Sequence, residues 1–188
     1  MGLTVDTPNG PFTLARGCDG CTLCCKVMQV AAPIDKPMNR WCVHCIPGTG
    51  CGIHQTRPPV CRNFHCVWLM DASFGEEWRP EHCHMVLWLD LEGRRLNINA
   101  DEDFPDVWRA EPYYSQLTAL AAAVLPRNGQ VVVYVGWDVF VILPDRHVAL
   151  GQLAPDEYIF IERLPDGGWD ARKVDETEAQ ALRAAGRV

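Results

Sequence analysis

All ten cysteines of the 188-residue chain lie between Cys18 and Cys83, and the 105 residues that follow contain none. Five of the six histidines fall in or at the edge of the same stretch, namely His44, His54, His65, His82 and His84. Thiolates and imidazoles are the ligands that soft and borderline metal ions prefer. The first half of the chain is therefore predicted to be organised around a metal, and the second half around an ordinary core.

The choice between metal and disulfides depends on the compartment. The N-terminal MGLTVDTPNGPF has neither the basic nor the apolar region of a secretory signal, so a cytoplasmic location is expected. Thiols stay reduced in the cytoplasm, and three cysteines at two-residue gaps followed by an adjacent pair form a poor disulfide framework. The longest apolar run, Leu117–Leu125, has about half of the roughly 18 residues of a membrane span, so no membrane partner is expected.

The chain is acidic, with a formal net charge of −7 from 17 basic and 24 acidic residues. The acid excess lies after Asp90, in the part without cysteines. A generic nucleic-acid binder needs a basic surface, so nucleic acid is not an expected partner. Metal ions are the expected partners, and a protein is a further candidate partner.

The pattern of apolar, Gly and Pro residues predicts an α+β fold. Residues 1–84 are expected to form an irregular, cysteine-rich region that a metal stabilises. Residues 85–188 are expected to form an α+β region with a small antiparallel sheet and two or three helices. The two regions are expected to share one core. Expected helices are 21–28, 58–70, 111–125 and 175–183, the last capped by Asp175 or Thr177, and expected strands are 85–91, 94–98, 130–135, 137–143, 158–163 and 169–174. Turns are expected at Pro8–Gly10 and Glu92–Gly93.

The cysteine region opens with CDGCTLCC, which contains Cys18, Cys21, Cys24 and Cys25. The first three repeat the Cys-x-x-Cys-x-x-Cys spacing of bacterial ferredoxins, which wraps successive thiolates around one iron–sulfur cluster. A helix over 21–28 would place Cys21, Cys24 and Cys25 on one face. Cys25 could then ligate the same centre, bridge two metals, or pack as a buried thiol.

The second group contains Cys42, Cys45, Cys51 and Cys61. Cys42-x-x-Cys45 has the spacing of a metal knuckle, and Gly48, Gly50 and Gly52 allow the turns that return Cys51 to it. Pro58-Pro59 predicts a helix start, where Cys61 would gain a lowered pKa. The predicted metal ligands are thus eight, Cys18, Cys21, Cys24, Cys25, Cys42, Cys45, Cys51 and Cys61, enough for one cluster and a further site or for one polynuclear centre.

Other side chains are weaker candidates. Cys66 and Cys83 have no characteristic spacing. His65 follows Cys61 by four residues, so one helix could direct His65 and Cys61 at one metal, or leave His65 on the surface. His82 and His84 would share one side of a strand beginning there, and the sequence favours a surface position for both. His147 is distant in sequence and is not expected to take part.

The motifs CDGCTLCC, WCVHC and GCGIHQTRPPVCRNF together resemble the CxxCxxCC cysteine-cluster family, also called the YkgJ-type or putative zinc- or iron-chelating domain. The resemblance covers about residues 17–66, in which the motifs follow in order and include Arg57-Pro58-x-x-Cys61. It implies metal binding, often described as an iron–sulfur cluster. Members usually carry Tyr where this chain has His54, a departure that could add a ligand. Residues 85–188 match no family.

Three functions remain open. The ferredoxin-like spacing favours a protein that holds iron or a [4Fe–4S]-type cluster for a redox role or for metal handling. The Cys42/Cys45 knuckle favours a zinc-stabilised interaction module. A metalloenzyme of unknown substrate is the third, although the chain lacks the HExxH and HxE patterns of zinc hydrolases. Arg57, Arg62, Trp41, Phe64 and Trp68 could shape a pocket, but the aromatic residues are expected in the core.

Overall fold

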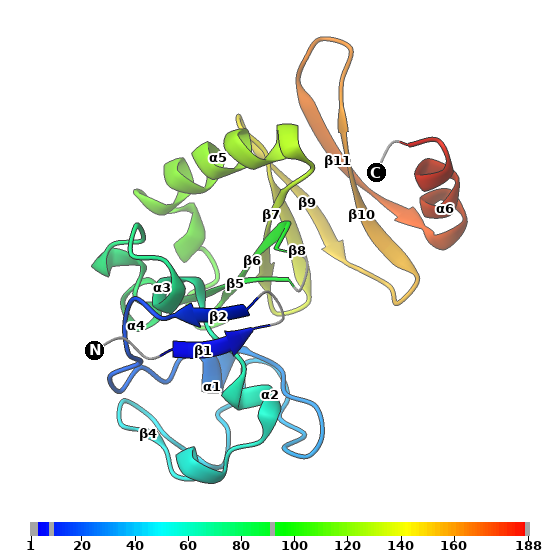
Figure 1. Ribbon diagram of the computed structural model, residues 1–188. Coiled ribbons are helices and arrows are strands. Elements are labelled where there is room, and N and C mark those ends of the chain that lie inside the picture. The colour runs from blue at the N-terminus through cyan, green and yellow to red at the C-terminus, as the bar shows by residue number, and fades with distance from the viewer. Residues whose placement is uncertain (1–3, 8–9, 91–92, 187–188) are drawn as a thin grey trace. The chain divides into compact units, whose positions relative to one another are not determined.

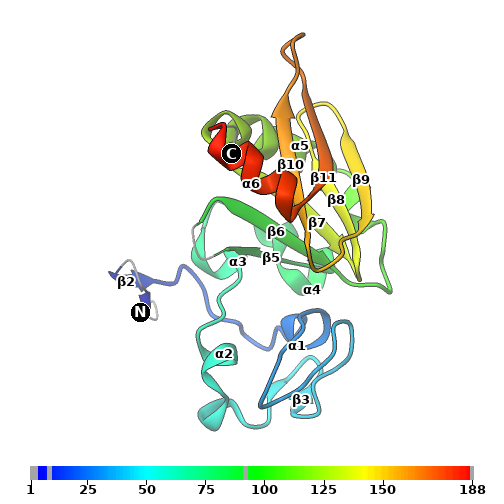
Figure 2. The same ribbon diagram turned by 90° about the vertical axis from the view of Figure 1, so that its right-hand side faces the viewer.

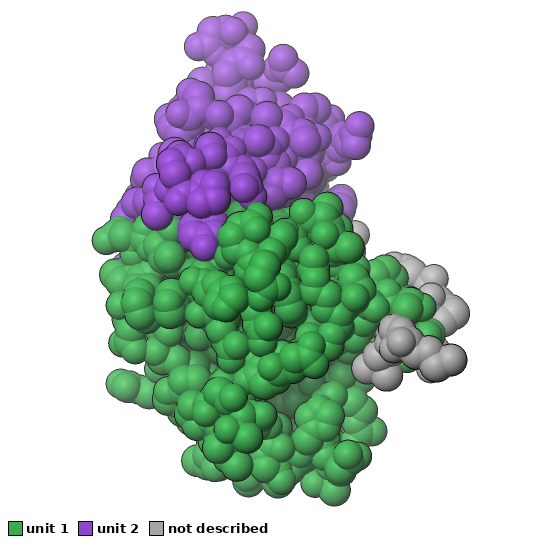
Figure 3. Space-filling view, turned by 90° about the vertical axis from the view of Figure 1, so that its left-hand side faces the viewer, with its two compact units in different colours: residues 1–89, 99–107 green, residues 90–98, 108–188 purple. Residues whose placement is uncertain are grey.

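The computed structural model describes residues 4–7, 10–90 and 93–186 of the chain. The turn residues Pro8, Asn9 and Glu92 lie outside this part. The fold is α+β, as predicted. Two compact units make it up: residues 1–89 with 99–107, and residues 90–98 with 108–188 (Figure 3).

The secondary structure consists of short elements in the first unit and longer ones in the second (Figure 1). The α-helices are α1 Cys24–Val27, α2 Pro59–Arg62, α3 Val67–Met70, α4 Pro80–Cys83, α5 Tyr113–Val124 and α6 Glu176–Ala184. The 3-10 turns are η1 His54–Thr56, η2 Glu76–Trp78, η3 Val107–Arg109 and η4 Leu125–Arg127. The strands are β1 Thr4–Thr7, β2 Gly10–Thr13, β3 Cys45–Ile46, β4 Gly50–Cys51, β5 Met85–Leu89, β6 Arg95–Ala100, β7 Gln130–Val135, β8 Asp138–Ile142, β9 His147–Gln152, β10 Glu157–Arg163 and β11 Trp169–Asp175.

A five-stranded sheet in the order β5-β6-β7-β8-β9 forms the largest sheet. β7 and β8 are antiparallel, with Val132 opposite Val141, and the tight turn at Gly136 has the positive φ of 57° that glycine tolerates. β7 and β8 confirm the strands predicted over 130–135 and 137–143. β9 was not predicted, because its HVALGQ sequence lacks the run of β-branched residues that marks β7 and β8.

The second unit ends in a hairpin, β10–β11, followed by α6 (Figure 2). The four buried residues that join them are Phe160, Val174, Ala179 and Leu182. Asp175 caps α6, because its carboxylate accepts a hydrogen bond of 2.8 Å from the backbone N–H of Glu178. Of the two predicted caps, Asp175 is therefore correct.

Replacing that cap tests the α6 assignment. Asp175→Ala is expected to lower the free energy of unfolding by about 1 kcal/mol, since the Glu178 N–H loses its acceptor. Thr177→Ala, two residues further on, is the matched control and is expected to change it by less than half of that. Chemical denaturation measures both, and equal effects would contradict the cap.

The first unit builds its core from a limited part of its chain. Its largest fully buried side chains are Trp78, Met85, Val27 and Val86. From residue 28 to residue 65, all of which the structure describes, no apolar side chain is buried, and the two buried side chains are the polar Lys36 and Asn39. The apolar side chains of this segment are therefore half-buried or exposed, and none is fully enclosed in a hydrophobic core.

Two predicted helices differ from the structure. The helix expected over 58–70 is wrong: α2 ends at Arg62, and α3 begins only at Val67, because Cys66 is extended with φ −74° and ψ 157°. The helix expected over 21–28 is limited to the single turn of α1. Within the described residues, no helix is long and apolar enough to cross a membrane.

Candidate metal centre

Four cysteines line one cavity in the first unit, and we call them the cavity thiols: Cys18, Cys21, Cys24 and Cys66. The cavity has a volume of about 40 Å³, and the remaining residues in its lining are Phe64, Trp68, Leu69, Pro80 and Val86. The thiols come from three places, namely the loop before α1, the first residue of α1 and the residue that precedes α3. In that loop the N–H of Cys21 donates to the carbonyl of Cys18 over 2.8 Å, which turns both residues toward one another.

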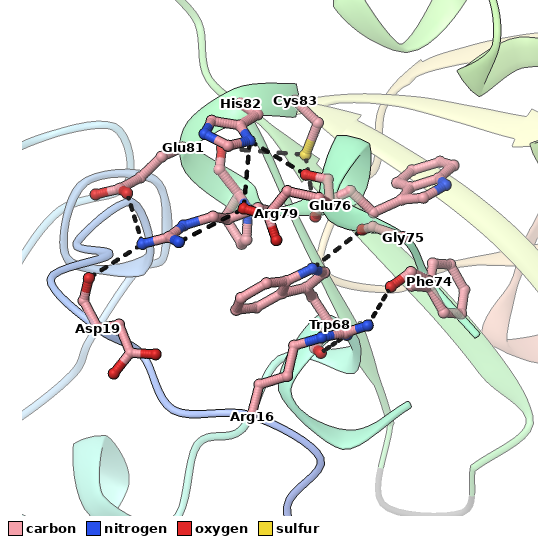
Figure 4. A network of polar contacts seen from close by, with 12 residues as sticks. Arg16, Asp19, Trp68, Phe74, Gly75, Glu76, Arg79, Glu81, His82 and Cys83 are labelled. Atoms are coloured by element: carbon pink, nitrogen blue, oxygen red, sulfur yellow. Dashed lines mark hydrogen bonds and ion pairs between the residues drawn. The ribbon is translucent and has the colours of Figure 1, made fainter. Parts of the chain in front are cut away.

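Two arginines fix the loop before Cys18 against α3 and α4 (Figure 4). Arg16 donates to the carbonyls of Trp68 at 2.5 Å and Phe74 at 2.7 Å, and Arg79 donates to that of Asp19 at 3.0 Å. Both guanidinium groups also lie over the Trp68 ring, 4.7 Å and 5.5 Å from its centroid. Because Asp19 follows Cys18 directly, this network places the start of the cysteine motif beside the cavity wall.

Five more cysteines form a second group, which we call the hairpin thiols: Cys25, Cys42, Cys45, Cys51 and Cys61. β3 and β4 pair Cys45 with Cys51 across a hairpin whose turn uses Gly48 and Gly50 at positive φ, as predicted. The N–H of Cys42 donates to the carbonyl of Cys25 over 2.9 Å. Segments far apart in the sequence are thus brought to one small region.

The pKa shifts of the hairpin thiols show that they lie close together. Burial is the largest cause that raises the pKa of Cys61, and the charges of Cys25, Cys42 and Cys51 raise it further. Burial likewise raises the pKa of Cys45, and the neighbouring Cys25 adds to the rise. The lowered pKa predicted for Cys61 at a helix start is therefore wrong, because desolvation and like charges outweigh the four-residue helix α2.

Cys24 and Cys25 turn to different groups although they are adjacent. Cys24 lines the cavity, whereas Cys25 contacts Cys45 and Cys42 of the hairpin thiols. The two groups touch here, because a hydrogen bond from the Cys24 thiol is the main cause that lowers the pKa of Cys25. The single face predicted for Cys21, Cys24 and Cys25 is wrong, since α1 begins only at Cys24.

A buried lysine lies beside the hairpin thiols. Lys36 is 5% exposed, and its ammonium group donates to the carbonyls of Lys26 at 2.7 Å, Pro37 at 2.8 Å and Arg40 at 2.8 Å. Burial lowers its pKa, and the charges of nearby thiols, first Cys42 and then Cys25, oppose that shift. In the described chain no carboxylate forms an ion pair with Lys36, so the thiols are its available source of negative charge.

Arg57 supplies a second cation. Its charge lowers the pKa of Cys18, a cavity thiol, and of Cys61, a hairpin thiol, although burial raises both on balance. The Nε atom of Arg57 is buried, and no residue in the described ranges provides it with a hydrogen-bond partner. An N–H left without an acceptor in a buried place is costly, so this atom suits a site that contains an anionic group.

The remaining candidates do not line the cavity, although Cys83 lies within range of the charges of Cys21 and Cys66. Cys83 is fully buried, and its thiol donates to the carbonyl of Met85 at 3.3 Å, as a structural thiol does. His82 lies in α4 and His84 follows it in left-handed backbone, so the strand expected to hold both is wrong. His65 lies beyond the end of α2 and shares no helix with Cys61.

His54 and His147 are also placed. His54 opens η1 and is exposed to solvent. His147 begins β9 in the second unit, where its Nδ1 lies 3.0 Å from the Tyr114 hydroxyl and its ring meets Trp108 edge-on. Of the predicted core aromatics, Trp68 is buried and Phe64 lines the cavity, whereas Trp41 is 43% exposed.

The donor chemistry of this region fits a metal held by thiolates. All ten cysteines are free thiols, nine of them fall into the two groups, and cations from Lys36 and Arg57 accompany them. Within the described residues, however, no three His, Cys, Asp or Glu side chains converge closely enough to hold a single metal ion. In this arrangement the thiols of the described residues do not form the ligand shell of a single ion.

Comparison with protein families, with curated proteins and with solved structures finds no match to this chain.

Proposed function

We propose that this chain is a cytoplasmic metal-binding protein of the CxxCxxCC type, in which cysteines from residues 18–66 hold iron, preferably as an iron–sulfur cluster. Thiolates are the usual protein ligands of such clusters, which supply one-electron transfer when bound. A redox role or metal handling follows from this chemistry. The cysteines that would hold the metal are the cavity thiols and the hairpin thiols.

The main observation that supports this proposal is the lack of buried apolar side chains in residues 28–65. The segment buries no apolar side chain and carries no disulfide, yet it forms a hairpin and brings distant cysteines together. Ordering a chain costs about 1–2 kcal/mol per residue in backbone entropy, which must be offset by other interactions. Metal–thiolate bonds supply that stabilisation in small metal-binding domains, where metal binding and folding are the same event.

The charges beside the thiols support the same conclusion. A metal surrounded by thiolates has a negative overall charge, and a buried cation nearby offsets it. The ammonium group of Lys36 donates to carbonyl oxygens and lies within range of thiol charges, and Arg57 has a buried Nε without a partner in the described chain. Both cations suit an anionic metal centre better than ten neutral thiols.

Purification without oxygen, followed by analysis for iron, zinc and acid-labile sulfide, tests this function. The expected result is iron and sulfide bound in a fixed ratio to the protein, with an absorption band at about 400 nm. Oxygen must be excluded because zinc binds thiolates more tightly than iron(II) and replaces it once a cluster is lost. A folded protein that carries no metal in native mass spectrometry would refute the proposal.

A zinc-stabilised interaction module is the second candidate, and one surface feature favours it. Large apolar side chains near the hairpin thiols are exposed, namely Trp41 at 43%, Val43 at 87%, Ile46 at 55% and Val60 at 49%. Exposed apolar residues gathered on one segment are typical of a surface that binds another protein. Protein that stays colourless with iron and sulfide, but binds zinc stoichiometrically and gains stability, would support this candidate instead.

A further inference from the structure

We propose that Cys66 is the fourth ligand of a four-thiolate iron–sulfur centre whose other ligands are Cys18, Cys21 and Cys24, and that Cys25 belongs to the neighbouring hairpin group instead. This inference rests on the proposed function and assigns its ligands. It departs from the reading of CDGCTLCC as a four-ligand unit.

The residues that line the cavity support this ligand assignment. Its lining contains Cys18, Cys21, Cys24 and Cys66 but not Cys25. Four thiolates are the number that a [4Fe–4S] cluster requires. Cys66 is separated from Cys24 by the whole hairpin segment, yet the break between α2 and α3 brings it to the same cavity wall.

The spacing of these thiols favours a cluster over a single ion. A tetrahedral zinc site holds its sulfurs about 2.3 Å from the metal and therefore within about 4 Å of one another. No three ligand side chains in the described chain converge to hold one ion, although four thiols face one cavity. A cluster separates its ligands by its own iron and sulfide atoms, so it fits thiols that line a space without meeting.

The rest of the cavity wall also suits a cluster. Phe64, Leu69 and Val86 supply apolar surface, and the Trp68 ring is held by Arg16 and Arg79. Apolar surroundings limit the access of water to the bound group and tune its potential. Arg57, whose buried Nε has no hydrogen-bond partner within the described residues, adds a cation near Cys18.

The hairpin group accounts for Cys25. The carbonyl of Cys25 accepts a hydrogen bond from the N–H of Cys42, and its thiol contacts that of Cys45. The charge of Cys25 also acts on the Cys61 thiol. Three other hairpin thiols, Cys42, Cys45 and Cys61, therefore lie near Cys25 and offer it ligand partners outside the cavity. The two groups meet at the contact between Cys24 and Cys25, and Cys18 also lies within range of the charge of Cys25.

The test compares four forms of the full-length protein after reconstitution with iron(II) and sulfide without oxygen: wild type, Cys66→Ser, Cys25→Ser and Cys83→Ser. Cys83 is the matched control because it is also a buried thiol but lies outside the cavity lining. Changes in groups that merely support a metal ligand already cost about 10–100-fold in affinity. In Cys66→Ser, the chelator concentration that removes half of the cluster iron is therefore expected to fall at least about tenfold.

Cys83→Ser is expected to keep the cluster absorption and its resistance to chelator. Cys25→Ser is expected to keep the absorption band while changing the metal content of the hairpin thiols. A cluster in Cys66→Ser as resistant as that of wild type would overturn the assignment, and so would loss of the cluster band in Cys25→Ser. Wild-type protein that binds no metal refutes the proposed function itself, which separates the two failures.

A second measurement guards against misfolding of the Cys66→Ser variant. Alkylation of wild-type protein under mild denaturant compares the loaded with the chelated form, and mass spectrometry locates the labelled thiols. Metal is expected to protect Cys66 together with Cys18, Cys21 and Cys24, and to release all four at one chelator concentration. Release of Cys66 independently of the other three would overturn the assignment.

Discussion

Removing the metal from the anaerobically prepared protein is expected to unfold residues 28–65 and leave the second unit intact. Structural zinc supplies on the order of 10 kcal/mol of apparent folding free energy in small peptides. Residues 28–65 have no buried apolar side chain to replace such a contribution. Chelation should therefore remove more stability than this segment retains by itself.

Hydrogen exchange followed by mass spectrometry measures this result. Backbone amides of the β3–β4 hairpin and of α2 are expected to lose their protection when the metal is removed. The backbone amides of β7 and β8 serve as the internal control. These strands contain the buried residues Val131, Val132 and Val141, so their amides should keep their protection from exchange. Unchanged protection of the hairpin in protein proven to be metal-free would contradict the prediction.

Replacing the buried lysine is the second change with a large expected effect. Lys36→Met removes the donor that satisfies the carbonyls of Lys26, Pro37 and Arg40 and the cation that faces the hairpin thiols. Removing one member of a buried charged arrangement typically costs about 3–5 kcal/mol, because its partners stay buried without compensation. The free energy of unfolding is expected to fall by about this amount, and the metal content with it.

Lys173→Met is the matched control, since it is the same substitution at a partly exposed site. Lys173 pairs with Glu157 at 3.2 Å, and both side chains are 31% exposed. Exposed pairs of this kind contribute about 0–1 kcal/mol. Denaturation curves for both variants in the presence of metal decide the question, and a Lys36 variant as stable as the Lys173 variant would rule out the supporting role of the lysine.

The second half of the chain was predictable because local patterns decide it. Alternating and β-branched residues fix β7, β8, β10 and β11, and Asp175 marks the start of α6. β9 escaped prediction because its residues have weak strand preference and its place is set by pairing with β8.

The cysteine region was predictable in composition but not in arrangement. Its glycines and the pairing of Cys45 with Cys51 follow from the sequence, since tight turns need positive φ. The position of Cys66 in the cavity lining does not, because the residues after Pro58 suggested one continuous helix. The break at Asn63–Cys66 is a tertiary effect that no local spacing reveals, although Cys66 itself directly precedes the apolar run Val67–Leu69 that anchors α3 in the core.

The adjacency of Cys24 and Cys25 limits how this motif can vary. Successive residues of a helix point about 100° apart, which is why one turn of α1 directs neighbouring thiols to two groups. A residue inserted between them would swing one thiol away from its group, and a deletion would do the same. Length changes between Cys51 and Pro58 would displace no such pair. Natural or designed variants of this chain should therefore keep the spacing through α1 fixed and differ in length elsewhere.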